Sequence, residues 1–221
     1  MKKSLFIFYL TVFSVVAQEP AGEVKPATDY SGFYIRPTYS IGSKLEAHLS
    51  GDVSAKVDIP TELDLKGFAV GYEIQTANPK WSVFTEFQYG GDEIDFGTVT
   101  SGGITATNLK LNVDNFTLHV KPAYKVSEKL QILAGPYVGI GNVALTADSL
   151  TDGATTYTNA GIDKNYSIWG LTGSIRYQFS PNVSAEAGYN YFDTSREGIS
   201  GTGTNVGFEG GFWTFGLMYQ F

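Results

Sequence analysis

The sequence predicts an all-β chain that folds as an eight-stranded antiparallel up-and-down transmembrane β-barrel. Three observations lead to this fold class. Apolar and polar residues alternate with a period of two along most of the chain after residue 32. The connections between the alternating runs are short and long in turn. The apolar side of the runs carries so many aromatic residues that it must face lipid rather than a protein interior.

Eight alternating runs follow one another, and each is long enough for a tilted strand to cross a bilayer. They cover residues 33–42, 65–75, 81–90, 114–125, 130–141, 166–179, 183–192 and 212–221. Short turns rich in Pro, Asn and Ser join the runs at one end, at residues 77–80, 126–129 and 180–182. The segments at the other end are expected to be long loops, at residues 43–64, 91–113, 142–165 and 193–211. This spacing gives four hairpins that run up and down around a barrel.

The polarity of the two faces decides between a soluble and a membrane barrel. In the last run, Trp213 and Phe215 alternate with Thr214. An apolar face turned inward would have to pack all its bulky aromatic side chains into a lumen that eight strands leave only narrowly open. We therefore expect the apolar face to point outward into lipid and the face of small and polar residues to point inward. Closure of the barrel then pairs the backbone N–H and C=O groups of every strand edge. The fifth run is ambiguous, because Leu133 and Tyr137 fall on its polar side.

Aromatic residues also gather near the ends of the runs, where a membrane barrel carries two aromatic girdles. Three of them lie at the short-turn end and the others at the opposite end. The predicted girdle residues are Tyr39, Trp81, Tyr89, Phe116, Tyr124, Trp169, Phe179, Tyr191 and Trp213.

Charged residues on the inward face fall at similar depths in several runs. The predicted lumen charge network consists of Arg36, Glu73, Glu86, His119, Lys121, Arg176 and Glu186. Its three cations and three carboxylates balance, as a salt-bridged plug requires, since an unpaired buried charge is costly. The alternative is a gated or narrow conducting path lined by the same side chains.

The first 17 residues read as a secretory signal peptide. Lys2 and Lys3 precede an apolar stretch that is too short to span a membrane as a helix, and Val15 and Ala17 form a small-residue cleavage site. Residues 18–31 then form a short tail, and residues 32–221 form the barrel domain.

Composition excludes several classes of function. The 221 residues contain no Cys, which rules out disulfides and thiolate metal sites, and two His leave little room for a histidine metal site. A net charge of −7 without a basic stripe argues against nucleic acid as a partner. We expect no metal and no cofactor. Each of the four long segments is net negative, which fits either a solvated surface or bridging by divalent cations to an anionic lipid surface.

The last eight residues carry the most specific motif. The sequence TFGLMYQF matches the assembly signal of bacterial outer-membrane barrels at Thr214, Gly216, Tyr219 and Phe221. With the signal peptide and eight strands, the chain resembles the small barrel families around the OmpA transmembrane domain, OmpX, Ail and the opacity proteins. The resemblance covers residues 30–221.

This resemblance implies insertion into a Gram-negative outer membrane by the barrel assembly machinery. It also implies that the N-terminus and short turns lie in the periplasm and the long segments outside the cell. We further expect a monomer in contact with outer-membrane lipid and lipopolysaccharide. The resemblance leaves function open, because one fold serves many functions.

Function must therefore come from the lumen and the long segments. We expect a non-enzymatic protein that serves envelope integrity and binds or adheres through its surface segments. A narrow porin-like channel for small solutes or ions is the first alternative. A lipid A-modifying enzyme is the second, since some eight-stranded membrane barrels use His with Ser. Here His48 has Ser50 two residues on, and His119 has only Thr117 on its face.

Overall fold

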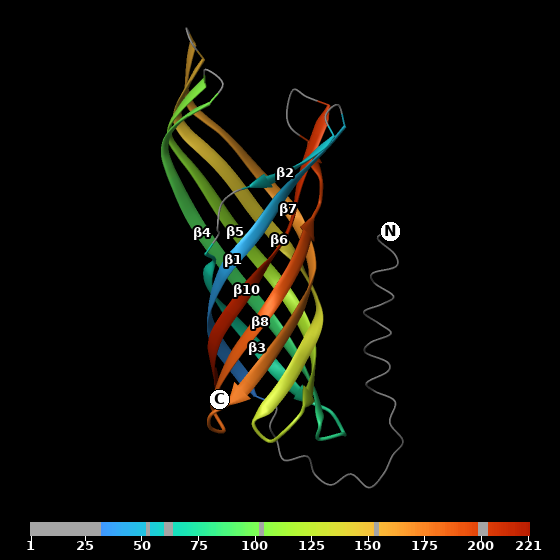
Figure 1. Ribbon diagram of the computed structural model, residues 1–221. Helices are drawn as coiled ribbons and strands as arrows, with labels where there is room; N and C mark the ends of the chain where they lie inside the picture. Colours follow the sequence, from blue (N-terminus) through green and yellow to red (C-terminus); the bar gives the residue numbers. More distant parts are fainter. Residues whose placement is uncertain (1–31, 52–53, 60–63, 102–103, 153–154, 199–202) are drawn as a thin grey trace.

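The computed structural model describes residues 32–221 except 52–53, 60–63, 102–103, 153–154 and 199–202. The signal peptide expected at 1–17 and the tail expected at 18–31 lie outside the described residues. Every strand pairs antiparallel with its neighbours, and the pairing of the first strand with the last closes the sheet into a barrel (Figure 1). The predicted fold class is confirmed. Within the described ranges, no helix has the length and apolar character needed to cross a membrane.

Eight long strands form the wall, and consecutive ones are neighbours. They are β1 (Phe33–Gly51), β3 (Lys66–Gln75), β4 (Trp81–Ser101), β5 (Ile104–Lys125), β6 (Leu130–Asp152), β7 (Thr155–Gln178), β8 (Val183–Thr194) and β10 (Thr204–Gln220). Two short strands, β2 (Ala55–Ile59) and β9 (Glu197–Gly198), pair with the outer parts of β1 and β10.

The two ends of the barrel differ. At the short-turn end, tight turns join the strands. A hydrogen bond from Val126 N to Leu130 O closes one of them, and a bond from Phe179 N to Val183 O closes another, both at 2.9 Å. The chain terminus at Phe221 also lies at this end (Figure 1). The strands project much further at the opposite end, which we call the hairpin end.

The long segments at the hairpin end are mostly strand rather than loop, so the prediction of long loops was wrong for most of 91–113 and 142–165. β4 and β5 stay paired as far as Ser101 and Ile104, and β6 and β7 as far as Asp152 and Thr155. Their Thr and Val residues suit a pleated strand, and no Pro interrupts them. Register shifts around Gly97, which has a φ of +64°, accommodate the irregular part of the β4–β5 ladder.

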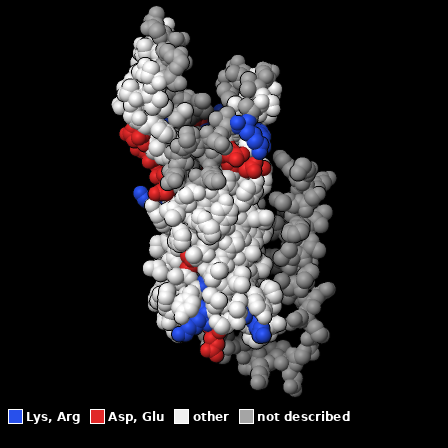
Figure 2. Space-filling view, viewed as in Figure 1, with Lys and Arg blue, Asp and Glu red and all other residues white. Residues whose placement is uncertain are grey.

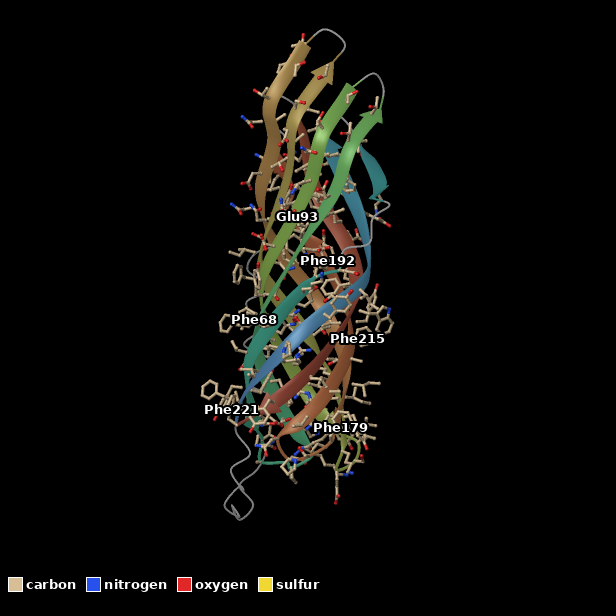
Figure 3. All side chains as sticks on the ribbon, turned by 90° about the vertical axis from the view of Figure 1, so that its left-hand side faces the viewer. Phe68, Glu93, Phe179, Phe192, Phe215 and Phe221 are labelled. Carbon is tan, nitrogen blue, oxygen red and sulfur yellow. The ribbon has the colours of Figure 1, made fainter. Side chains whose placement is uncertain are left out.

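The outward face is apolar along the membrane-spanning part, as the alternation predicts. On β4, Phe87 is 65% exposed while its neighbour Glu86 is fully buried. Phe68 and Phe215 likewise project away from the barrel (Figure 3). Charged side chains gather toward the two ends of the molecule and leave a broad uncharged band between them (Figure 2). This band is the surface that lipid covers.

The girdle residues predicted from the sequence all lie on the outward face and are exposed or half-exposed. Trp81 and Tyr124 pack together at the short-turn end, with 5.0 Å between ring centroids. Toward the hairpin end, three girdle tyrosines donate a hydrogen bond to a carboxylate: Tyr39 to Asp64 at 2.8 Å, Tyr89 to Asp114 at 2.7 Å and Tyr191 to Glu209 at 2.7 Å. A ring on the apolar band with its hydroxyl on a charged group is the position that tyrosine prefers at a membrane interface.

Candidate functional site

Two carboxylates form the centre of the lumen. Glu86 projects inward from β4 and Glu186 from β8, and a guanidinium bridges them: Arg36 lies 2.6 Å from Glu86 Oε1 and 3.5 Å from Glu186 Oε1. Lys121 Nζ bridges the same oxygens at 3.1 and 3.0 Å. Arg176 donates to Glu186 Oε2 through Nε at 3.1 Å and also through Nη2. Five strands therefore contribute to one ion-pair network.

The network is desolvated, and its members find further partners. Its five charged side chains are each at most 4% exposed. Tyr34 donates to Glu86 at 3.0 Å and Ser174 donates to Glu186 at 3.0 Å. The Arg176 guanidinium also lies 3.9 Å from the centre of the Phe84 ring, a favourable cation–π contact. Extra hydrogen bonds of this kind are what a buried ion-pair cluster needs to offset the loss of water.

Two of the residues expected in the network lie outside it. Glu73 pairs across the strands with Phe84 and accepts hydrogen bonds from Gln75 and Gln220 at 2.9 and 3.1 Å. His119 Nε2 lies 2.9 Å from Thr117 Oγ1, and its ring stacks on Tyr137 with 4.5 Å between centroids.

The central network consequently holds three cations and two carboxylates, a formal charge of +1, instead of the balanced set that the sequence predicted. Barrel shear is the cause, since it offsets strands that appear level when residues are counted from their ends.

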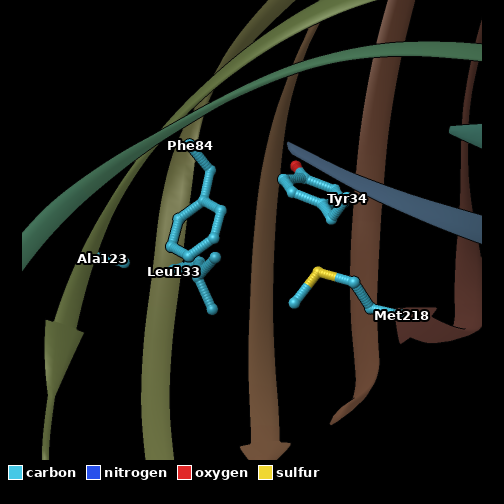
Figure 4. Close-up of a cluster of buried hydrophobic side chains, with 5 residues drawn as sticks. All are labelled: Tyr34, Phe84, Ala123, Leu133 and Met218. Atoms are coloured by element: carbon cyan, nitrogen blue, oxygen red, sulfur yellow. The ribbon is translucent and has the colours of Figure 1, made fainter. Parts of the chain in front are cut away.

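An apolar cluster lies below the network, on the side of the short turns. Its members are Tyr34, Phe84, Ala123, Leu133 and Met218 (Figure 4). Leu133 is fully buried in it, which explains the ambiguous polarity of the fifth run. Phe84 was missed by the sequence analysis, although it shares the parity of the inward residues Ser82 and Glu86 and could have been found on that ground.

The lumen is divided by these layers. The space among the network side chains amounts to about 10 Å³, close to the smallest cavity that holds a single water molecule. A polar vestibule of about 730 Å³ opens at the short-turn end, lined in part by Glu73 and Gln220. A separate cavity of about 400 Å³ lies toward the hairpin end. The vestibule reaches the underside of the network at Arg176, and the cavity reaches its upper side at His119, so the network is the narrowest level between them.

His48 lies at the hairpin end among charged groups. Its Nε2 is 3.1 Å from Glu209 and 3.6 Å from Glu46, and its Nδ1 is 3.2 Å from Arg196 Nη2. Ser50 is not among these contacts in the described part of the chain. Likewise, across the residues that the structure describes, no group of three or more His, Asp or Glu side chains is placed to hold a metal ion.

Comparison with known proteins decides the family. The model of the outer membrane protein beta-barrel domain matches residues 7–221. The chain belongs to this family. The closed antiparallel barrel with its apolar outward band is the fold expected of this family. The family assigns the chain to the outer membrane.

Several solved outer-membrane barrels are similar to this chain. Ail, the attachment invasion locus protein of Yersinia pestis, is 14% identical over 86% of this chain and 99% of its own, with a TM-score of 0.44. Neisserial surface protein A is 15% identical over 86% and 97%, with a TM-score of 0.46. OprG from Pseudomonas aeruginosa is 14% identical over 86% and 96%, with a TM-score of 0.43. No curated protein matches the sequence.

Proposed function

We propose that this protein is a non-enzymatic outer-membrane barrel with a closed lumen, which supports envelope integrity and binds its ligands at the hairpin end. The observation that carries the proposal is the narrowing of the lumen to about 10 Å³ at the ion-pair network, with an apolar cluster beneath it. A barrel that passes solutes needs a continuous water path. A barrel with a lumen this narrow is suited instead to serve as a rigid membrane anchor for the strands that project from it.

In this proposal the hairpin end faces the cell exterior, and the short turns and the N-terminus face the periplasm. A signal peptide at 1–17 would export the chain. The motif of Thr214, Gly216, Tyr219 and Phe221 would then engage the barrel assembly machinery from the periplasmic side. The C-terminal residue of the motif, Phe221, lies at the short-turn end, which supports this orientation.

The projecting hairpins supply the binding surface. Their outward side chains include Glu93 and Asp95, which lie 3.1 and 3.9 Å from Lys110. Because a single lysine serves two carboxylates, the surface retains negative charge. Such a surface would contact lipopolysaccharide through divalent cations shared with the lipid phosphates, as hard cations accept oxygen ligands from both partners.

The test is the conductance of the refolded protein in a planar bilayer, with only material used that shows a heat-shifted gel mobility. We expect no openings, while a porin measured in the same bilayer conducts. Steady openings of the wild-type barrel would replace this proposal with the channel alternative.

A lipid A acyl-release assay tests the non-enzymatic part separately. We expect no release, because the ring nitrogens of His48 contact charged groups and His119 is enclosed in the lumen. Release of acyl chains by the wild-type protein would establish the enzyme alternative.

A further inference from the structure

The interior of the barrel changes polarity along its length. On β5 the inward residues Lys121, His119 and Thr117 give way to Val113 and Leu111 toward the hairpin end. The other strands that line this upper interior show the same change. Its apolar members include Val143, Leu145, Tyr166, Ile168, Phe192, Phe208 and Phe212.

The solvent outside the barrel explains this inversion. Where lipid surrounds the strands, the apolar side chains point outward. Beyond the lipid, water surrounds them, and the apolar side chains turn inward. Phe192, for example, lies within the outline of the barrel, whereas Phe215 on the membrane-spanning part projects outward (Figure 3). The projecting strands are thus built like a water-soluble barrel with an apolar interior, the type of barrel that holds small ligands.

This apolar interior is not filled by its own side chains. The cavity there measures about 400 Å³, within the range of roughly 300–1,000 Å³ that small-molecule pockets occupy. The network level of the same barrel leaves about 10 Å³. A close-packed interior would leave no such space.

The floor of the cavity carries an unsatisfied polar atom. His119 is 4% exposed and lines both the cavity and the network layer below it. Its Nε2 is engaged by Thr117, and its ring is held flat against Tyr137. Nδ1 is buried and has no hydrogen-bond partner among the described residues. When Thr117 donates to Nε2, Nδ1 carries the proton and is a buried donor that lacks a partner among the described residues at the level of the floor.

The charge beneath the floor selects the sign of that occupant. The network adjoining His119 carries a formal charge of +1, because the three cations Arg36, Lys121 and Arg176 pair with the two carboxylates of Glu86 and Glu186 among the described residues. An anion at the floor would balance this charge in a desolvated setting, where electrostatic attraction is strong. A cation there would be repelled.

We infer that the cavity binds a medium-chain aliphatic carboxylate, with its hydrocarbon chain among the apolar side chains and its carboxylate accepting a hydrogen bond from His119 Nδ1. This inference goes beyond the proposed function. It depends on the proposed function in one respect, because the ion-pair network forms the floor of the cavity. The ligand enters from the hairpin end and leaves by the same end.

The experiment is photo-crosslinking of the full protein in nanodiscs with a diazirine derivative of decanoic acid. Labelled peptides are mapped by mass spectrometry. We expect labelling on the strands that carry Phe192 and Phe208, and decanoate should compete at a concentration about tenfold lower than decanol, since a charge-assisted hydrogen bond is lost with the alcohol. Empty nanodiscs report the partition of the probe into lipid.

Two variants on one strand separate the cavity from the lipid surface. Val143→Trp fills the cavity from β6 and should abolish the labelling. Ile140→Trp adds the same side chain on the lipid-facing side of β6, where Ile140 is 63% exposed, and should leave it unchanged. If Val143→Trp lacks the heat-shifted mobility of the folded form, Leu145→Phe is the smaller replacement. Labelling that survives filling of the cavity would overturn the proposal.

A third variant tests the head group. His119→Phe keeps the stacking on Tyr137 and removes Nδ1, so decanoate and decanol should then compete equally. If His119→Phe still prefers decanoate over decanol, and Lys164→Gln at the cavity wall loses this preference, the carboxylate binds elsewhere. That result would overturn the role of His119. If the wild-type protein conducts ions and still binds decanoate, the proposed function alone is contradicted. If it does not conduct and does not bind decanoate, this inference alone is contradicted.

Discussion

Glu186 is the residue on which the lumen network depends most. It pairs with Arg36, Lys121 and Arg176, and its side chain is 3% exposed. Glu186→Gln keeps the size of the side chain and removes its charge, which leaves buried cations unpaired. Because breaking a buried pair costs about 3–5 kcal/mol, we expect a large fall in the free energy of unfolding.

The measurement is the urea midpoint of the heat-shifted gel mobility in lipid vesicles. Glu93→Gln is the matched control, because Glu93 pairs with Lys110 on the exposed hairpin and an exposed pair contributes about 0–1 kcal/mol. Equal midpoints for the two variants would contradict a structural role for the network.

Tyr191 and Glu209 offer a residue-level test by pH. The hydrogen bond that the Tyr191 hydroxyl donates holds the pKa of Glu209 below its ordinary value, with Lys56 and His48 adding to the effect. A carboxylate with a depressed pKa adds stability above the pKa of the unfolded chain and loses it as pH falls through the pKa of the folded form. We expect Tyr191→Phe to raise the pKa of Glu209, as measured by carbon NMR of the carboxyl group. An unchanged titration would show that the hydroxyl is not bonded in solution.

At the scale of the elements, the projecting hairpins are the part that distinguishes this barrel. The ladder pairs Glu93 with Asn112 and Asp95 with Lys110 beyond the girdle. Because these segments are strands, the backbone amides that donate within the ladder are protected from exchange. We expect slow hydrogen exchange at Lys110 and Asn112, which lie on β5 between β4 and β6. We expect faster exchange at Glu93, whose amide donates to the Asp92 side chain, and around Gly97, where the register shifts. Uniformly fast exchange throughout 91–113 would show that this segment is a loop in solution, as its composition predicts.

Much of the fold was readable from the sequence, since a period of two and the spacing of turns define strands, hairpins and the outward face. Parity also places Arg36, Lys121 and Glu186 in the lumen. Glu73 was misplaced because shear between strands cannot be read from one chain. The hairpins were missed because Gly, Thr and Ser are as common in loops as in irregular ladders. The cavity was missed because the inward face was assumed polar along its whole length.

At the scale of the whole molecule, the interior is a series of layers with opposite character. The apolar cavity, the charged network, the apolar cluster and the polar vestibule follow one another from the hairpin end to the short-turn end. Each layer narrows the lumen, although Arg36 Nε and Arg176 Nη1 of the network are buried without a hydrogen-bond partner among the described residues. Barriers in series must all be opened before ions can pass.

This arrangement predicts that single variants stay silent and a double variant conducts. Lys121→Ala opens space in the network and leaves two guanidinium groups facing two carboxylates, a balanced set that remains stable. Phe84→Ala opens the apolar cluster, where Phe84 is fully buried. In a planar bilayer we expect no openings from either single variant and steady openings from the double variant. Conductance of Lys121→Ala alone would show that the network is the sole barrier, because an intact apolar cluster should still exclude hydrated ions.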